Sequence, residues 1–151
     1  MTRLLALVTA FAALALTACG EDRTPETDAT RVPGPTDTLI VYERTGGEEG
    51  ARERIDVRPD GAARITDRDK SKRVKLSIGE LNSLQDARLN VDFERLEDTY
   101  GGSNQIVADA YEATLTADGR SVKILHDAKV PPELERLRAT SAMLLEKYRP
   151  R

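Results

Sequence analysis

Few side chains in this sequence could carry out covalent chemistry. His126 is the only histidine and Cys19 the only cysteine, and no serine lies in a motif typical of a strained nucleophile turn. A nucleophile and its base are therefore hard to assemble. His126 continues the strand alternation of Val122 and Ile124, which predicts a packed or rim position for this residue. We expect no enzymatic activity.

Metal chemistry has little support from residue spacing. Zinc requires several histidine or cysteine ligands. Asp67, Asp69, Glu48 and Glu49 could offer oxygen ligands to calcium, but no loop has the spacing of an EF-hand. With 26 acidic residues in the chain, pairs of carboxylates arise by chance. We expect no metal ion and no other cofactor.

Asp109 is the acidic residue whose predicted placement is unusual. The alternation of Val107, Tyr111 and Ala113 puts Asp109 on the apolar face of a predicted strand. Burial there would require a hydrogen-bond partner. The other interpretation is that Asp109 lies at the strand end and caps a loop.

Cys19 follows a segment with the form of an export signal. Arg3 provides a positive start, an apolar run occupies residues 4–16, and two small residues precede the cysteine. This pattern resembles the lipobox of bacterial lipoproteins, which implies that Cys19 is acylated and becomes the first residue of the mature chain. An ordinary secretory signal with an incidental cysteine is the alternative. The apolar run of about 13 residues is shorter than the roughly 20 that a membrane helix needs.

The organisation that follows is a signal peptide over residues 1–18, a tether over residues 19–37 and one folded domain over residues 38–151. The tether contains Pro25, Pro33 and Pro35 and almost no large apolar side chain, so it cannot bury enough surface to order itself. Its reach is about 25 Å by coil statistics. We expect a lipid-anchored protein on the extracytoplasmic face of the cell membrane.

Composition excludes some partners. The net charge is −3, and acidic and basic residues are interspersed, so we expect no nucleic-acid binding, which requires a basic face. A single cysteine cannot form a disulfide within one chain, so the domain must rely on its own core.

Strand patterns dominate residues 38–126, in the segments 38–45, 52–58, 62–67, 107–117 and 120–126. The turns between them are marked by glycine-rich residues 46–50, by residues 59–61 and by Asp118-Gly119, which is a type I′ hairpin signal. The charged residues 68–73 predict a solvated loop, with a binding patch as the alternative.

Two helices are predicted. Ser77 and Glu80 fit a capping box ahead of the first, and Pro131-Pro132 opens the second. A further turn of helix is expected within residues 90–100. Strands grouped apart from helices indicate an α+β fold, with an antiparallel sheet of about five strands in the order β-β-β-α-β-β-α and helices packed on one face.

Two separated segments, residues 40–50 and residues 108–134, together resemble the emfourin-like family of bacterial metallopeptidase inhibitors. In that family a strand ends in a basic residue, a small hydroxyl residue, two glycines, two apolar residues and a glycine. The corresponding residues here, which the resemblance implies as a partner-binding loop, are Arg44, Thr45, Gly46, Gly47, Glu48, Glu49 and Gly50. Asp109 matches an acidic residue at the start of the family's later hairpin.

The resemblance implies inhibition of thermolysin-like metallopeptidases. Glu48 and Glu49 depart from the family, which tends to have an aromatic and a small residue there, and two carboxylates would change the target or abolish inhibition. A non-inhibitory envelope binding or sensing module is the alternative function. A small-molecule binder or enzyme is a third hypothesis, which would require a deep pocket around Asp109, Tyr111 and His126.

Overall fold

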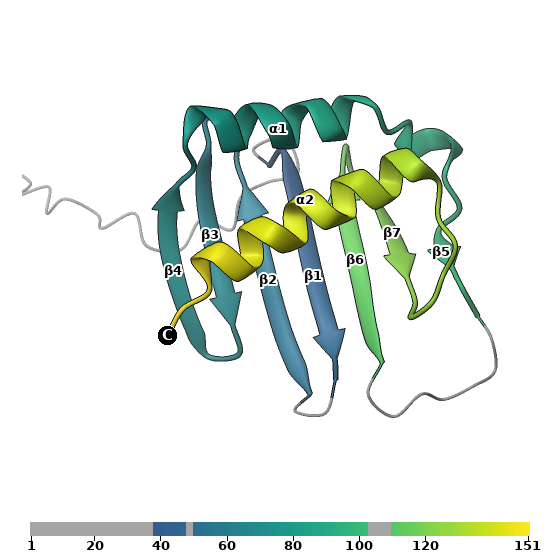
Figure 1. Cartoon of the computed structure of the whole chain (residues 1–151), viewed down its shortest axis with the longest axis horizontal. Helices are drawn as coiled ribbons and strands as arrows, with labels where there is room; N and C mark the ends of the chain where they lie inside the picture. Colours follow the sequence, from purple (N-terminus) through teal and green to yellow (C-terminus); the bar gives the residue numbers. More distant parts are fainter. Residues whose placement is uncertain (1–37, 48–49, 103–109) are drawn as a thin grey trace, which may run out of the picture. The chain divides into compact units, whose positions relative to one another are not determined.

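The computed structural model of this chain describes residues 38–47, 50–102 and 110–151 (Figure 1). The strands of this part are β1 (Ile40–Gly46), β2 (Ala51–Val57), β3 (Ala62–Asp67), β4 (Lys70–Lys75), β5 (Thr99–Tyr100), β6 (Tyr111–Ala117) and β7 (Arg120–Ile124). The helices are α1 (Ile78–Leu89), the short 3₁₀ helix η2 (Phe93–Arg95) and α2 (Pro132–Tyr148). The fold is α+β.

All the described strands belong to one sheet in the order β4-β3-β2-β1-β6-β7-β5. Neighbouring strands are antiparallel except β5 and β7, which are parallel. The sheet is therefore larger than the predicted five strands. Alternation could not reveal β4 because this edge strand is charged along most of its length, and β5 has only two residues. The prediction of a solvated loop over residues 68–73 was therefore wrong, because residues 70–73 belong to the charged edge strand β4.

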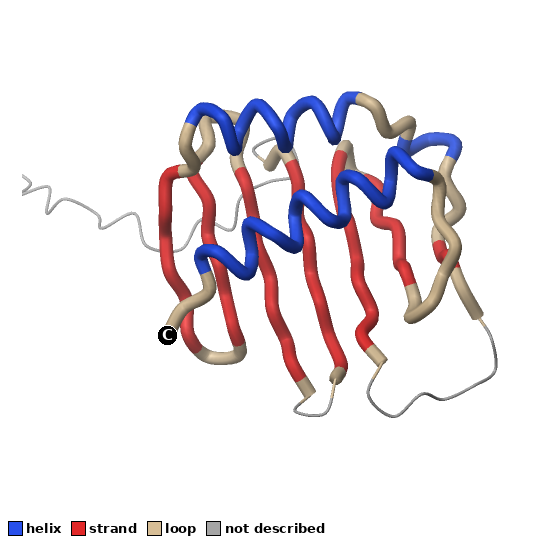
Figure 2. Tube along the Cα trace, viewed as in Figure 1, coloured by secondary structure: helices blue, strands red, loops and turns tan. Residues whose placement is uncertain are grey.

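The core lies between one face of the sheet and the two helices, and α2 crosses that face diagonally (Figure 2). Ile55 and Val57 point inward from β2, as their alternation predicted. Leu134 and Leu137 line the buried side of α2. All buried hydrophobic side chains of the described part come from residues 40–145, so the folded domain contains its own core.

Helix α1 runs along the end of the sheet where the β2–β3 and β6–β7 turns lie (Figure 1). Its capping box is confirmed, since the Ser77 hydroxyl accepts from the Glu80 amide and the Glu80 carboxylate accepts from the Ser77 amide. Arg88 forms an ion pair with Asp118 in the β6–β7 turn. Asp118 and Gly119 both have positive φ, at 52° and 77°, which confirms the predicted type I′ turn.

The predicted strand position of His126 was wrong. Strand β7 ends at Ile124, and His126 lies in the following turn, where its exposed imidazole approaches Asp127 at 3.1 Å. None of the described helices is long and apolar enough to cross a membrane.

Candidate functional site

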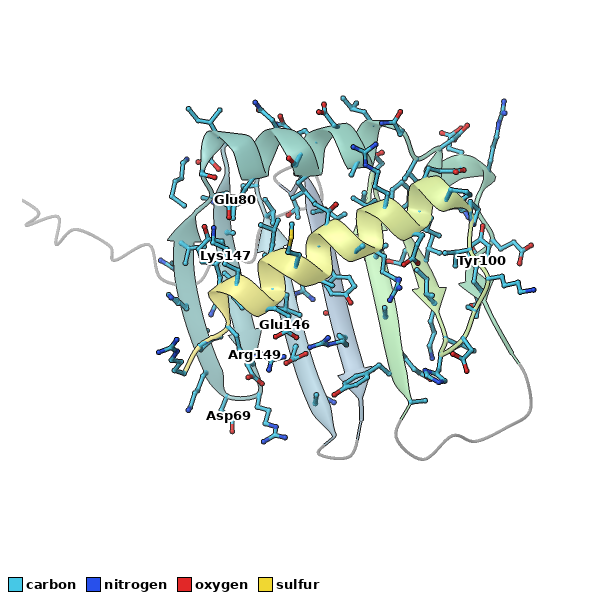
Figure 3. The ribbon with its side chains drawn as sticks, in the orientation of Figure 1. Asp69, Glu80, Tyr100, Glu146, Lys147 and Arg149 are labelled. Carbon is cyan, nitrogen blue, oxygen red and sulfur yellow. The ribbon has the colours of Figure 1, made fainter. Side chains whose placement is uncertain are left out.

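The candidate site lies at the end of the sheet away from α1, where the β1–β2 hairpin, the β3–β4 turn and the chain after α2 meet. These segments enclose an open hollow of about 700 Å³. Figure 3 labels Asp69, Glu146 and Arg149 around this end of the sheet. The hollow is lined by Gly47, Ala51, Glu53, Asp67, Arg68, Asp69, Lys70, Tyr111, Arg149 and Pro150.

Glu53 is the buried charge at the base of this hollow. It lies on the inner face of β2, two residues before Ile55, and is only 4% exposed. One carboxylate oxygen accepts a 2.6 Å hydrogen bond from Arg44 Nε, and the other forms an ion pair with Arg149. Two guanidinium groups therefore compensate the cost of burying this carboxylate.

Glu146, in the last turn of α2, completes a four-membered network. Its Oε1 lies 2.6 Å from an Arg44 guanidinium nitrogen and 2.8 Å from one of Arg149. Burial alone lowers the pKa of Arg44, but the hydrogen bonds to Glu146 and Glu53 outweigh it, so the pKa is raised above its usual value. The network fastens the end of α2 to the β1–β2 hairpin.

Arg149 retains one unused donor. Its Nε atom is buried and has no hydrogen-bond partner among the described residues. An unpaired buried donor carries a free-energy penalty that a suitable acceptor would relieve.

Gly46 and Gly47 are held against the start of β6. Their φ angles are 107° and 77°, values that non-glycine residues rarely adopt. A Cβ atom on Gly46 would lie 2.2 Å from the Ala110 carbonyl oxygen, and one on Gly47 would lie 2.6 Å from the Tyr111 ring. Position 46 therefore requires glycine for backbone conformation and for space, because its neighbour is backbone, whereas a side chain at Gly47 would have to displace the outer end of the Tyr111 ring.

Tyr111 connects this glycine turn to the charged network. Its ring stacks beneath the Arg44 guanidinium, with 5.0 Å between the guanidinium carbon and the ring centroid. The side chain remains 45% exposed, so one part supports Gly47 and another faces solvent. Such an exposed, supported aromatic ring is suited to contact a partner.

The structure separates the predicted site residues into two groups. Arg44 points into the network and is an internal brace, whereas Thr45 and Gly50 are exposed on the hairpin. Glu48, Glu49 and Asp109 lie outside the described residues, as does the predicted lipidation site Cys19. His126 does not line the hollow that Tyr111 borders.

Sequence reasoning missed Glu53, Glu146 and Arg149. For Glu53 a signal was present, because it shares the alternation of Ile55 and Val57 and hence their inward face. Glu146 and Arg149 carry no such signal, since only the packing of α2 brings Glu146 to Arg44 on β1 and Arg149 to Glu53 on β2. Within the described residues, no group of three or more metal-ligating side chains is placed to hold a metal ion.

No protein-family model matches the chain, and no curated protein matches it either.

Proposed function

We propose that this chain is a lipid-anchored extracytoplasmic protein whose folded domain binds another protein through the hairpin end of its sheet. The partner in this proposal is a thermolysin-like metallopeptidase, which the domain inhibits. The anchor is the acylated thiol of Cys19. Acyl chains contribute about 0.8 kcal/mol per buried methylene, so two or more chains hold a protein firmly.

The observation that supports this function best is the bracing of the glycine turn. Gly46 is packed on Ala110, Gly47 on Tyr111, and the strand before them is fixed by the Arg44–Glu53 hydrogen bond. Contact residues that are held in place, as Gly46 and Gly47 are, lose little conformational entropy on binding, which favours affinity. Inhibition by a protein requires such a surface and no catalytic group.

The alternative is a non-inhibitory binding or sensing module of the cell envelope. Glu48 and Glu49 favour it, because two carboxylates stand where the resembled inhibitors have an aromatic and a small residue. The same hairpin end would then bind a different protein.

The deciding experiment is a titration of residues 38–151 against a thermolysin-like peptidase with a fluorogenic peptide substrate. Stoichiometric loss of activity supports inhibition. Absence of inhibition at micromolar concentration contradicts it, and a specific partner captured from envelope extract would then support the alternative.

Two asparagine variants test whether the hairpin makes the contact. Gly47→Asn and Gly119→Asn alter residues with the same φ of 77°, which asparagine tolerates comparatively well. Only the first side chain collides with another residue, Tyr111, since the space around Gly119 is open. Inhibition should be lost with Gly47→Asn and kept with Gly119→Asn. Equal inhibition by both folded variants would place the contact elsewhere.

A further inference from the structure

The outer face of the sheet carries an uncompensated positive charge over β3 and β4. Both helices lie on the opposite face, so this one has no covering element among the described residues (Figure 1). Arg64, Arg73 and Lys75 project from it and are exposed. Arg64 and Arg73 are directly opposite each other in the antiparallel register. These three residues are called the basic face below.

Two other cations of the outer face are paired with carboxylates. Arg54 on β2 is paired with Asp56, with 2.6 Å between Nη2 and Oδ1, and also with Glu43 on β1. Lys123 on β7 lies 2.7 Å from Glu112 on β6. The sheet thus provides a carboxylate for each of these cations.

No such partner is provided at the basic face. Arg64 and Arg73 form no ion pair with any residue that the structure describes, and Asp56, the register neighbour of Arg64, is engaged by Arg54. Lys75 has only an exposed contact of 3.3 Å with Asp60. The charge therefore remains available to an external anion.

The charge extends beyond the basic face along the edge of the sheet. Lys70 and Lys72 are exposed on the edge strand β4. Residues 51–75 contain nine basic and five acidic side chains, a net charge of +4 in a chain whose total is −3. The molecule therefore has a pronounced charge asymmetry, and such an asymmetry attracts a protein to surfaces of opposite charge.

Protection of the sheet edge explains only part of this pattern. Lysines on an edge strand prevent pairing with other chains, which accounts for Lys72 on β4. Arg64 lies on β3, which is paired on both sides, and like charges directly opposite each other destabilise a sheet. Edge protection does not require an arginine there.

We propose that the basic face docks on the anionic phospholipid headgroups of the membrane to which the chain is anchored. This inference rests on the proposed acylation of Cys19, which keeps the domain within a tether's length of the headgroups. The positive charge of the basic face and the absence of a covering element among the described residues both favour a planar anionic surface as the partner. Screening limits such attraction to about 10 Å at 0.1 M salt, so the attraction acts only while the tether keeps the domain close. In this orientation helix α2, on the opposite face of the sheet, lies on the side of the domain away from the membrane.

The test uses the unlipidated domain, residues 38–151, in co-sedimentation with vesicles. We expect binding to vesicles of mixed phosphatidylglycerol and phosphatidylcholine, weakening as salt is raised, and none to pure phosphatidylcholine. Arg64→Gln with Arg73→Gln should lower the partition coefficient about tenfold or more. The matched control is Arg95→Gln with Arg136→Gln, which removes the same charge from exposed residues away from the basic face.

Three results would overturn the proposal. The first is equal binding to neutral and anionic vesicles. The second is a loss of vesicle binding in the control variant as large as that in the variant of the basic face. The third is binding to polyglutamate or DNA without binding to vesicles. Because the tested domain lacks Cys19, its vesicle binding does not depend on acylation. Peptidase inhibition is measured without vesicles, so each proposal can fail separately.

Discussion

Glu53 Oε2 accepts a 2.6 Å hydrogen bond from Arg44 Nε, and the two residues are direct cross-strand partners on β2 and β1. Glu53 is almost fully buried whereas Arg44 is partly exposed, so the strand pair holds an anion beneath a cation at the rim of the sheet. This relationship fixes the base of the hairpin that we propose as the contact surface.

Glu53→Gln should destabilise the domain by about 1–3 kcal/mol, because Arg44 and Arg149 would lose the charge that compensates their partial burial. Urea unfolding measures this difference. The matched control is Glu43→Gln, on the outer face of the neighbouring strand, where the half-exposed carboxylate pairs with Arg54. That change should cost less than about 1 kcal/mol. Equal losses for both variants would show that the buried network does not stabilise the hairpin.

Glu80 should make stability depend on acidic pH. Hydrogen bonds from Lys147, from the Ser77 hydroxyl and from the Ser77 amide lower its pKa from 4.5 to about 2. A lowered carboxylate pKa stabilises the folded state fully above about pH 4.5, and the contribution is lost as the pH falls towards 2.

The variant Glu80→Gln tests this dependence. It should cost about 1 kcal/mol at pH 7, the typical net value of a side-chain hydrogen bond, and should reduce the fall in stability between pH 5 and about pH 2. Unfolding midpoints across that pH range measure this change in pH dependence. The control is the variant Glu97→Gln, which alters an exposed residue. An unchanged pH profile in Glu80→Gln would assign the dependence to other carboxylates.

Tyr111→Ala should destabilise the domain by about 0.5–2 kcal/mol, since it removes the ring beneath Arg44 and the packing on Gly47. Tyr111→Phe keeps the ring and should change stability by less than about 0.5 kcal/mol. The alanine change should also relieve the collision created by Gly47→Asn. The double variant should therefore lose less stability than the sum of the losses of the two single variants. Additive losses would contradict the contact between Gly47 and Tyr111.

Cys19→Ser should abolish acylation, because no other thiol exists in the chain. Intact-mass measurement of the membrane fraction should find a diacylglycerol-modified chain beginning at Cys19 for the wild type only. The serine variant should remain unprocessed or be released. Retention of a processed serine variant in the membrane would contradict the lipobox interpretation.

Local chemistry was enough to predict several elements. The strand pattern of β2, the Asp118-Gly119 turn and the Ser77–Glu80 cap were all predicted correctly, because each depends on residues within a few positions of one another. The α+β class followed from their order. The sheet was underestimated because β4 is stabilised by pairing with β3 and not by its own apolar pattern.

The sequence by itself determined the alternation that makes the sheet, the caps and turns that bound its helices, and the glycines that allow the β1–β2 hairpin. Only the tertiary structure decided that Arg44 is an internal brace and that Arg149 meets Glu53. It also decided that Arg64 and Arg73 face each other on an uncovered surface. The physical reason is range: backbone propensities act over a few residues, whereas charge networks and charged faces depend on which distant segments the packing brings together.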